Sequence, residues 1–348
     1  MDRALTGERA GQAPRRINLA LQGGGAHGAF TWGVLDRLLL DEGVEIAGIS
    51  GTSAGALNGA AVKAGLAVGS RARARENLEW LWTQVGAVTD DRLGPWLDAF
   101  SPMAVSYAVE ASPLYQWSDA VSRGVSPYAT PGWSDDVLRR IVERFRYEDV
   151  CSERGPAFHI CATNVRTGKI RLFTKREITA DAILASACLP TLFPAVEIDG
   201  EAYWDGGYTG NPALFPLFVP ELPADILVVN INPLERPELP VTARDIQNRI
   251  NEISFNTSLF RELRAIDFVQ RLLEGGKVPE GAMKTVLVHM VSDDRLMRQL
   301  SVATKTVANP IVIHQLRRAG HAAADAFLRD HRDALGVRST VDLRAMFA

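Results

Sequence analysis

The pentapeptide GTSAG at residues 51–55 has the spacing of a nucleophilic serine between two glycines. It follows an apolar run and opens an alanine-rich run, so we expect a strand before it and a helix after it. Such a sharp turn favours glycine at its flanks and exposes the serine hydroxyl at the end of the sheet. The helix N-terminus stabilises developing negative charge. We therefore predict that Ser53 is a nucleophile, with Gly51 and Gly55 supporting the turn.

A second glycine cluster, QGGGAHG at residues 22–28, also lies at an expected strand-to-helix junction. Consecutive glycines let several backbone N–H groups point into one cavity, where they bind a phosphate or an oxyanion. One interpretation is an oxyanion hole beside Ser53. Another is dinucleotide binding, because Gly23, Gly25 and Gly28 match the G-x-G-x-x-G pattern.

The two interpretations differ in the residue that they require at the end of the next strand. A dinucleotide site needs an acidic residue at the end of that strand to hold the ribose. Here the strand runs directly into GTSAG, and Glu45 lies at its start. The sequence therefore favours an oxyanion hole, while a glycine-rich turn without a ligand stays open as a third interpretation.

A serine nucleophile also needs a base, and none of the six histidines stands out as one. His289 lies within a buried strand pattern, where a satisfied core histidine is the commoner case. Asp205 ends an expected strand and precedes Gly206 and Gly207, which would let its carboxylate approach the serine. An ordinary carboxylate is a weak base, so this role requires burial next to the serine. A plain Asp-Gly turn is the alternative.

These three motifs, with ASACLP at 185–190 and Asn211-Pro212, resemble the sequence blocks of the patatin-like phospholipases. The resemblance spans roughly residues 17–232. It implies a three-layer α/β/α sandwich with a mainly parallel central sheet, and a Ser-Asp dyad that needs no metal and no cofactor. By this resemblance Ser53 is the nucleophile and Asp205 the base. The oxyanion donors are then backbone groups of Gly23, Gly24, Gly25 and His27.

The resemblance also bears on charge, because this family often carries Arg or Lys where this chain has His27. A neutral imidazole would supply less fixed positive charge near the oxyanion. The implied partner is a lipid or another acyl ester.

The elements that would position these residues alternate along the chain. The alternation predicts a mainly parallel α/β sheet in a single domain, 17–348, after a flexible segment, 1–16. The part from 235 to 348 is expected to be helical and has no assigned role. Strands are expected at 17–22, 44–50, 158–164, 169–173, 202–205, 225–231 and 285–291, and helices at 28–41, 54–64, 135–145, 179–187, 242–274 and 311–331.

The segment 89–133 interrupts this alternation with five prolines and seven Trp, Tyr and Phe residues. We predict an irregular insertion. It is either a packed loop or a cap over the acyl site that contacts aggregated lipid, since long irregular segments are often functional.

Composition excludes several classes of protein. Hydrophobic residues make up 47% and charged residues 23%, as in ordinary globular proteins. The net charge of −3 gives no basic excess for nucleic acid. Three cysteines indicate a reducing compartment, and no apolar run is long enough for a spanning helix. We therefore expect a cytoplasmic protein, with peripheral membrane contact left open and no prediction of oligomeric state.

The leading hypothesis is a serine lipid acyl hydrolase of the phospholipase A or lysophospholipase kind. The same dyad would also serve a soluble carboxylesterase, a thioesterase or a storage-polyester depolymerase. From other classes, a nucleotide-binding oxidoreductase and a catalytically silent lipid-binding protein are the alternatives.

Overall fold

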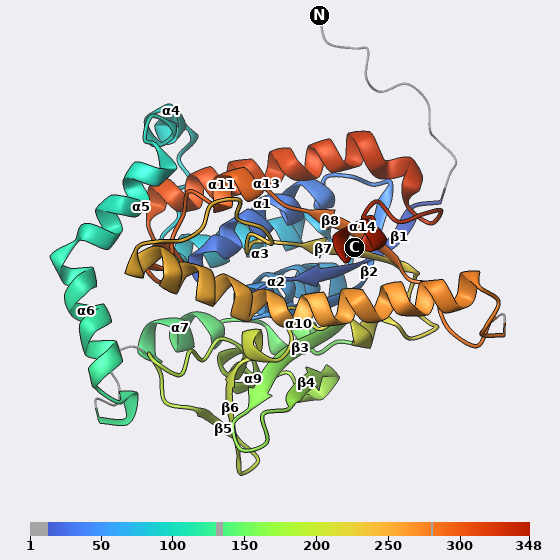
Figure 1. The fold of residues 1–348 in the computed structure, drawn as a ribbon, viewed down its shortest axis with the longest axis horizontal. Coiled ribbons are helices and arrows are strands. Elements are labelled where there is room, and N and C mark those ends of the chain that lie inside the picture. Colours follow the sequence, from blue (N-terminus) through green and yellow to red (C-terminus); the bar gives the residue numbers. More distant parts are fainter. Residues whose placement is uncertain (1–12, 130–134, 280) are drawn as a thin grey trace, which may run out of the picture.

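The computed structural model describes residues 13–129, 135–279 and 281–348, and a single twisted sheet runs through its centre (Figure 1). The strand order is β5-β6-β3-β2-β1-β7-β8, with β4 paired to β3. The five strands from β3 to β8 in this order are parallel, whereas β4, β5 and β6 pair antiparallel. The strands are β1 (Arg15–Leu21), β2 (Val44–Thr52), β3 (Ala157–Asn164), β4 (Ile170–Thr174), β5 (Val196–Ile198), β6 (Glu201–Asp205), β7 (Asp225–Val229) and β8 (Leu287–Val291).

Helices cover both faces of this sheet. The α-helices of the described residues are α1 (Gly28–Leu39), α2 (Ala54–Ala67), α3 (Arg71–Val85), α4 (Gly94–Asp98), α5 (Pro102–Ala111), α6 (Pro113–Gly124), α7 (Asp135–Val142), α8 (Tyr147–Val150), α9 (Ala180–Ser186), α10 (Ala243–Glu274), α11 (Asp294–Met297), α12 (Val302–Thr306), α13 (Pro310–His331) and α14 (Leu343–Met346).

The alternation of side chains along the central strands creates two cores. Leu19 and Leu21 of β1 belong to a large buried cluster with residues of α1, α2, α3 and α13. Ala20, between them, belongs to a second cluster that contains Leu259 and Leu263 of α10. The sheet is therefore enclosed between two helical layers, and the predicted α/β/α sandwich is confirmed (Figure 1).

One boundary of the predicted organisation differs from the structure. Strand β1 begins at Arg15, so the last two residues of the predicted flexible segment are part of the sheet, while residues 1–12 lie outside the described residues. The part after residue 235 is mainly helical, and the strand predicted at 285–291 is present as β8, which extends the sheet beside β7.

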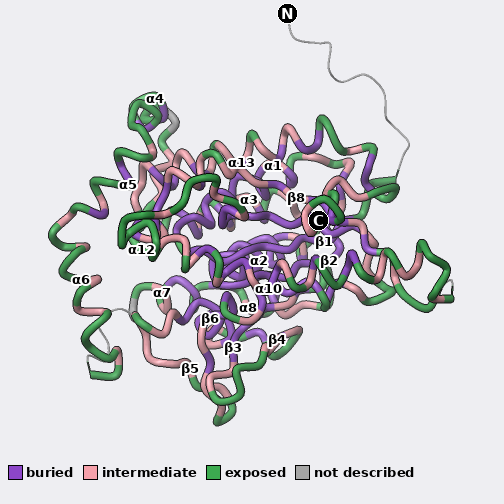
Figure 2. The backbone as a smooth tube through the Cα atoms, viewed as in Figure 1, coloured by how far each residue is buried: buried purple, intermediate pink, exposed green. Residues whose placement is uncertain are grey.

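The predicted irregular insertion is wrong for the described residues 89–129, which form mainly helices α4, α5 and α6. Pro95, Pro102 and Pro113 lie in the first turns of these helices, where a missing N–H costs nothing and the fixed φ suits a helix. The prolines therefore start helices instead of breaking them. Helix α6 buries none of its residues and lies at the edge of the molecule (Figure 2).

His289 of β8 is a satisfied core histidine, as its strand pattern suggested. Its imidazole is fully buried, and its Nε2 lies 2.9 Å from Oδ1 of Asp225 on the neighbouring strand. Its Nδ1 lies 3.1 Å from the hydroxyl of Thr340. The same Asp225 oxygen also accepts the backbone N–H of Gly336 at 2.7 Å. These hydrogen bonds connect β7, β8 and the C-terminal loop.

We expect His289→Ala to lower the free energy of unfolding by about 2–4 kcal/mol, because it opens a cavity and removes a partner from a buried carboxylate. Chemical denaturation measures this change. His331→Ala, at an exposed position, is the control and should change stability by less than about 0.5 kcal/mol. Similar losses in the two variants would contradict the assignment of His289 to the core.

Candidate active site

Strand register brings Ser53 and Asp205 to the same edge of the sheet. Thr52 of β2 pairs with Cys161 of β3, and the next β3 residue, Ala162, pairs with Asp205 of β6. Ser53 follows Thr52 directly, so it lies level with Asp205 across one intervening strand. Both residues line one pocket of about 250 Å³.

The turn at Ser53 has the predicted arrangement of strand, sharp turn and helix. Ser53 adopts φ 54° and ψ −121°, a backbone conformation that costs a non-glycine residue about 1–3 kcal/mol. Its N–H donates to Oγ of Ser186 at 2.9 Å, and that hydroxyl donates to the Cys161 carbonyl at 2.6 Å. A Cβ at Gly55 would collide with the carbonyl of Leu21, so the helix approaches β1 only with glycine there. Gly51, the other flanking glycine, lies in β2.

Asp205 is 1% exposed at the end of β6. Its Oδ1 accepts the N–H of Gly207 at 2.7 Å, and Gly206 and Gly207 form the short 3₁₀ turn that follows. Burial raises the pKa of this carboxyl to about 7, although the Gly207 N–H and the Ser53 hydroxyl both favour the ionised form. Within the described residues, Oδ2 has no hydrogen bond of ordinary geometry. Catalytic hydrogen bonds are often loose before substrate binds.

The glycine loop offers fewer oxyanion donors than the sequence indicated. The N–H of Gly23 donates to Oδ1 of Asn211 at 2.6 Å, and the N–H of His27 donates to the carbonyl of Gly24 at 3.2 Å. Two of the four predicted donors, Gly23 and His27, are therefore engaged. The N–H groups of Gly24 and Gly25 have no hydrogen-bond partner among the described residues, and both glycines line the pocket. Ala54 at the N-terminus of α2 lines it as well.

Four buried amide side chains hold this loop, and sequence reasoning missed their role. Oε1 of Gln22 accepts the N–H of Ile231 at 2.9 Å, while its Nε2 donates to Oδ1 of Asn256 at 3.2 Å. Asn232 donates from Nδ2 to the carbonyl of Gly23 at 3.1 Å. With Asn211, these side chains satisfy each other's buried polar groups and fix the loop against β7 and α10.

His27 is not among the residues that line the pocket, and its buried imidazole contacts Thr304 instead. Its Nε2 lies 2.8 Å from the hydroxyl of Thr304, and burial, followed by the nearby charge of Lys305, lowers the pKa of the imidazole well below its usual value. The positive group in the pocket wall is Lys305 itself, which comes from α12. No sequence motif surrounds Lys305, so only its spatial position indicates a role.

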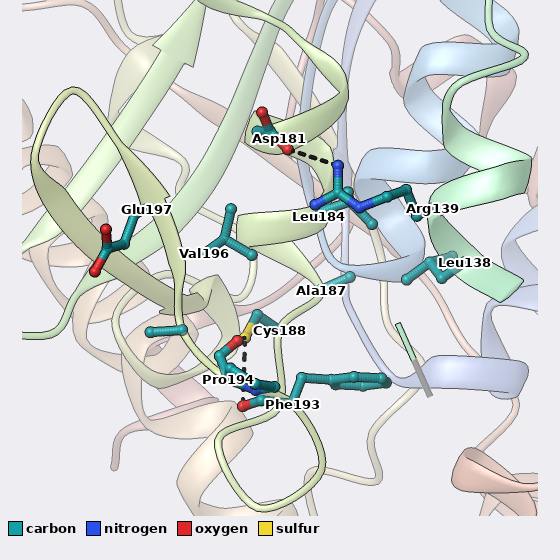
Figure 3. A pocket seen from close by; sticks show the side chains of 11 residues that line it. Leu138, Arg139, Asp181, Leu184, Ala187, Cys188, Phe193, Pro194, Val196 and Glu197 are labelled. Carbon is teal, nitrogen blue, oxygen red and sulfur yellow. Dashed lines mark hydrogen bonds and ion pairs between the residues drawn. The ribbon is translucent and has the colours of Figure 1, made fainter. Parts of the chain in front are cut away.

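The remaining pocket wall is mainly apolar and comes from distant parts of the chain. It includes Leu57, Leu81, Val85, Leu138, Leu189, Leu192, Phe193, Phe255 and Val302. A smaller pocket of about 220 Å³ shares Leu138, Ala187 and Phe193 with it and contains the ion pair between Arg139 and Asp181 at 3.0 Å (Figure 3). None of residues 89–129 lines the Ser53 pocket, so the predicted cap forms no part of its wall.

A family model described as "Patatin-like phospholipase" matches residues 19–218. The chain belongs to this family. Membership supports lipid acyl hydrolysis in general, and it favours this activity over the nucleotide-binding alternative. Among solved structures, the chain is similar to one titled "Crystal structure of VipD from Legionella pneumophila", with 16% identity and a TM-score of 0.42. That match covers 91% of this chain and 67% of the other. No curated protein matches the chain.

In the described part of the chain, no helix combines the length and the apolar character needed to cross a membrane. The same residues contain no group of three or more His, Cys, Asp or Glu side chains placed to hold a metal ion.

Because burial raises the pKa of Asp205, ionising this residue destabilises the fold. The penalty is absent below the pKa of the unfolded chain, grows as pH rises from about 4 to about 7, and is complete above that. We expect Asp205→Asn to raise the free energy of unfolding at pH 8 by roughly 2–4 kcal/mol, and by less at pH 5. Urea denaturation at both pH values measures the gain. A gain as large at pH 5 as at pH 8 would contradict the raised pKa.

Proposed function

We propose that this protein is a serine hydrolase of lipid acyl esters, with Ser53 as nucleophile and Asp205 as its base. The observation that carries the proposal is the placement of both side chains in one largely apolar pocket, where burial raises the pKa of the carboxyl to about 7. A base with such a pKa is ionised in a large fraction of molecules at neutral pH and still accepts a proton effectively.

The proposed reaction has two steps. The Ser53 oxygen attacks the ester carbonyl carbon while the hydroxyl proton passes to Asp205, which then protonates the leaving alcohol. Water attacks the acyl-serine next, giving its proton to Asp205, and the fatty acid leaves as the serine is protonated again. The N–H groups of Gly24, Gly25 and Ala54 would stabilise the oxyanion in both steps.

The pocket wall supports an acyl chain as the bound group. Leucine and phenylalanine side chains dominate the wall, and apolar surface favours the burial of hydrocarbon. A soluble carboxylesterase, a thioesterase or a storage-polyester depolymerase would use the same dyad. The rates of hydrolysis of a micellar phospholipid and of a monomeric short-chain ester distinguish a phospholipase from these other ester hydrolases.

Ser53→Ala tests the proposal directly. We expect a loss of several orders of magnitude in ester hydrolysis with an unchanged fold, by analogy with nucleophile deletions in other serine hydrolases. A fluorophosphonate probe should label the unmodified protein at Ser53, as checked by peptide mass spectrometry. Asp205→Asn should be nearly as damaging, and kcat/KM of the unmodified protein should rise with pH through about 7 as Asp205 ionises.

The outcomes against this proposal are specific. Labelling at another serine, or full activity of Ser53→Ala, would exclude Ser53 as the nucleophile. If His289→Ala or His314→Ala lost as much activity as Asp205→Asn while folded, a histidine base would replace the carboxylate.

Helices α4 to α6 are proposed to contact aggregated lipid. Trp96, Tyr107 and Trp117 are 58%, 65% and 54% exposed, so these side chains are not held in a core. Aromatic side chains with one polar end suit the boundary between water and lipid. In this proposal the helices bring the nearby pocket to the lipid surface, without closing over it.

We expect each of the substitutions Trp96→Ser, Tyr107→Ser and Trp117→Ser to weaken binding to phospholipid vesicles several-fold and to slow hydrolysis of vesicle lipid. Short soluble esters and thermal stability should change little. Vesicle sedimentation and melting curves measure these effects. Val337→Ser, at a position that is 64% exposed, is the matched control. A large drop in melting temperature with parallel loss of both activities would show that these aromatics stabilise the fold instead.

A further inference from the structure

Lys305 is held in the wall of the Ser53 pocket by neutral groups. Its ammonium donates to Oδ1 of Asn232 at 2.7 Å and to Oδ1 of Asn251 at 3.1 Å. It also lies 5.8 Å from the centre of the Phe255 ring, over its face. An ammonium has three donors, so one N–H has no hydrogen-bond acceptor among the described residues.

The charge of Lys305 is not neutralised locally. Within the described residues, no carboxylate lies within ion-pair distance of its Nζ. The nearby Glu252 already pairs with Arg236 at 2.6 Å and with Arg249 at 3.2 Å. Two guanidinium groups therefore already share the Glu252 carboxylate.

We propose that Lys305 binds a phosphate oxygen of the substrate, next to the acyl ester that Ser53 attacks. This inference rests on the proposed function and assigns the residue that would distinguish acyl esters with a phosphate from those without one. Lys305 lines the same pocket as Ser53, Gly24 and Gly25, whereas leucine and phenylalanine side chains line much of the rest. The acyl chain would therefore occupy the apolar wall, and the phosphate would lie at the lysine.

Desolvation supports this role. A cation in a mainly apolar pocket loses hydration, and burial accordingly lowers the pKa of Lys305 to about 8. Two amide oxygens replace only part of the lost water. A bound phosphate would supply the missing acceptor and the opposite charge, and charge-assisted hydrogen bonds are stronger than neutral ones.

A binding experiment separates this inference from the proposed hydrolysis. Isothermal titration of the Ser53→Ala protein with decyl phosphate and with 1-decanol, both below their aggregation limits, compares one chain with and without the phosphate. We expect decyl phosphate to bind about tenfold more tightly or better. Equal affinities for decyl phosphate and 1-decanol would overturn the inference, and this comparison needs no substitution of Lys305. Competition by inorganic phosphate would show that free phosphate binds too, and no competition would indicate that binding requires the chain.

Two substitutions in the same background identify the group responsible. Lys305→Gln keeps an N–H donor for the two asparagines without the charge, and should lose most of the preference for decyl phosphate. Lys305→Arg should keep most of it. Lys277→Met, which removes an exposed lysine beyond the end of α10, is the control and should leave both affinities unchanged. Retention of the preference in Lys305→Gln would show that Lys305 only supports the fold.

Hydrolysis by the protein with Ser53 intact gives the second comparison. The ratio of kcat/KM values for monoacylglycerol phosphate and monoacylglycerol of equal chain length should fall about tenfold in Lys305→Gln. Equal losses for the two substrates would indicate that Lys305 stabilises the oxyanion instead, which overturns the inference. Absence of hydrolysis in every protein would count against the proposed function, while the titration would still decide the phosphate site.

Discussion

Removal of the Asp205 carboxylate from water is the constraint on which the rest of the site depends. Burial gives this group a pKa near neutrality, but a buried carboxylate is tolerated only if its surroundings are fixed. The backbone N–H of Asp205 donates to the Cys188 carbonyl at 2.8 Å, and its carbonyl accepts from the hydroxyl of Thr163 at 2.9 Å. Gly207 fixes Oδ1. The backbone and one oxygen are thereby held, and the other oxygen is left to interact at the pocket.

The parts of the site that sequence predicts are those that depend on a few neighbouring residues. A sharp turn between a buried strand and a helix requires glycine close to it, so GTSAG identifies Ser53 from five residues. The same reasoning locates the glycine loop and the strand end at Asp205. Continuous apolar runs likewise predict the central strands, which are buried on both faces, and the helical spacing of apolar residues predicts the long helices.

What sequence could not predict depends on contacts between distant residues. Whether the Gly23 N–H is available depends on Asn211, which is 188 positions away. Whether His27 or Lys305 faces the pocket depends on Thr304 and on the packing of α12. In α4 to α6, proline is equally consistent with a loop and with the first turn of a helix, so local rules do not distinguish the two.

The C-terminal third links Lys305 to the glycine loop. The side-chain oxygen of Asn232 accepts a hydrogen bond from the ammonium of Lys305, and its nitrogen donates one to the carbonyl of Gly23. The carbonyl of Lys305 also lies so close to Gly25 that no Cβ fits there. Lys305 and its partner Asn232 therefore contact the glycine loop at two places, Gly25 and Gly23. Because Asn232, Asn251 and Lys305 all lie beyond the matched residues 19–218, the contacts that hold this lysine beside the pocket come from the part of the chain that follows the family segment.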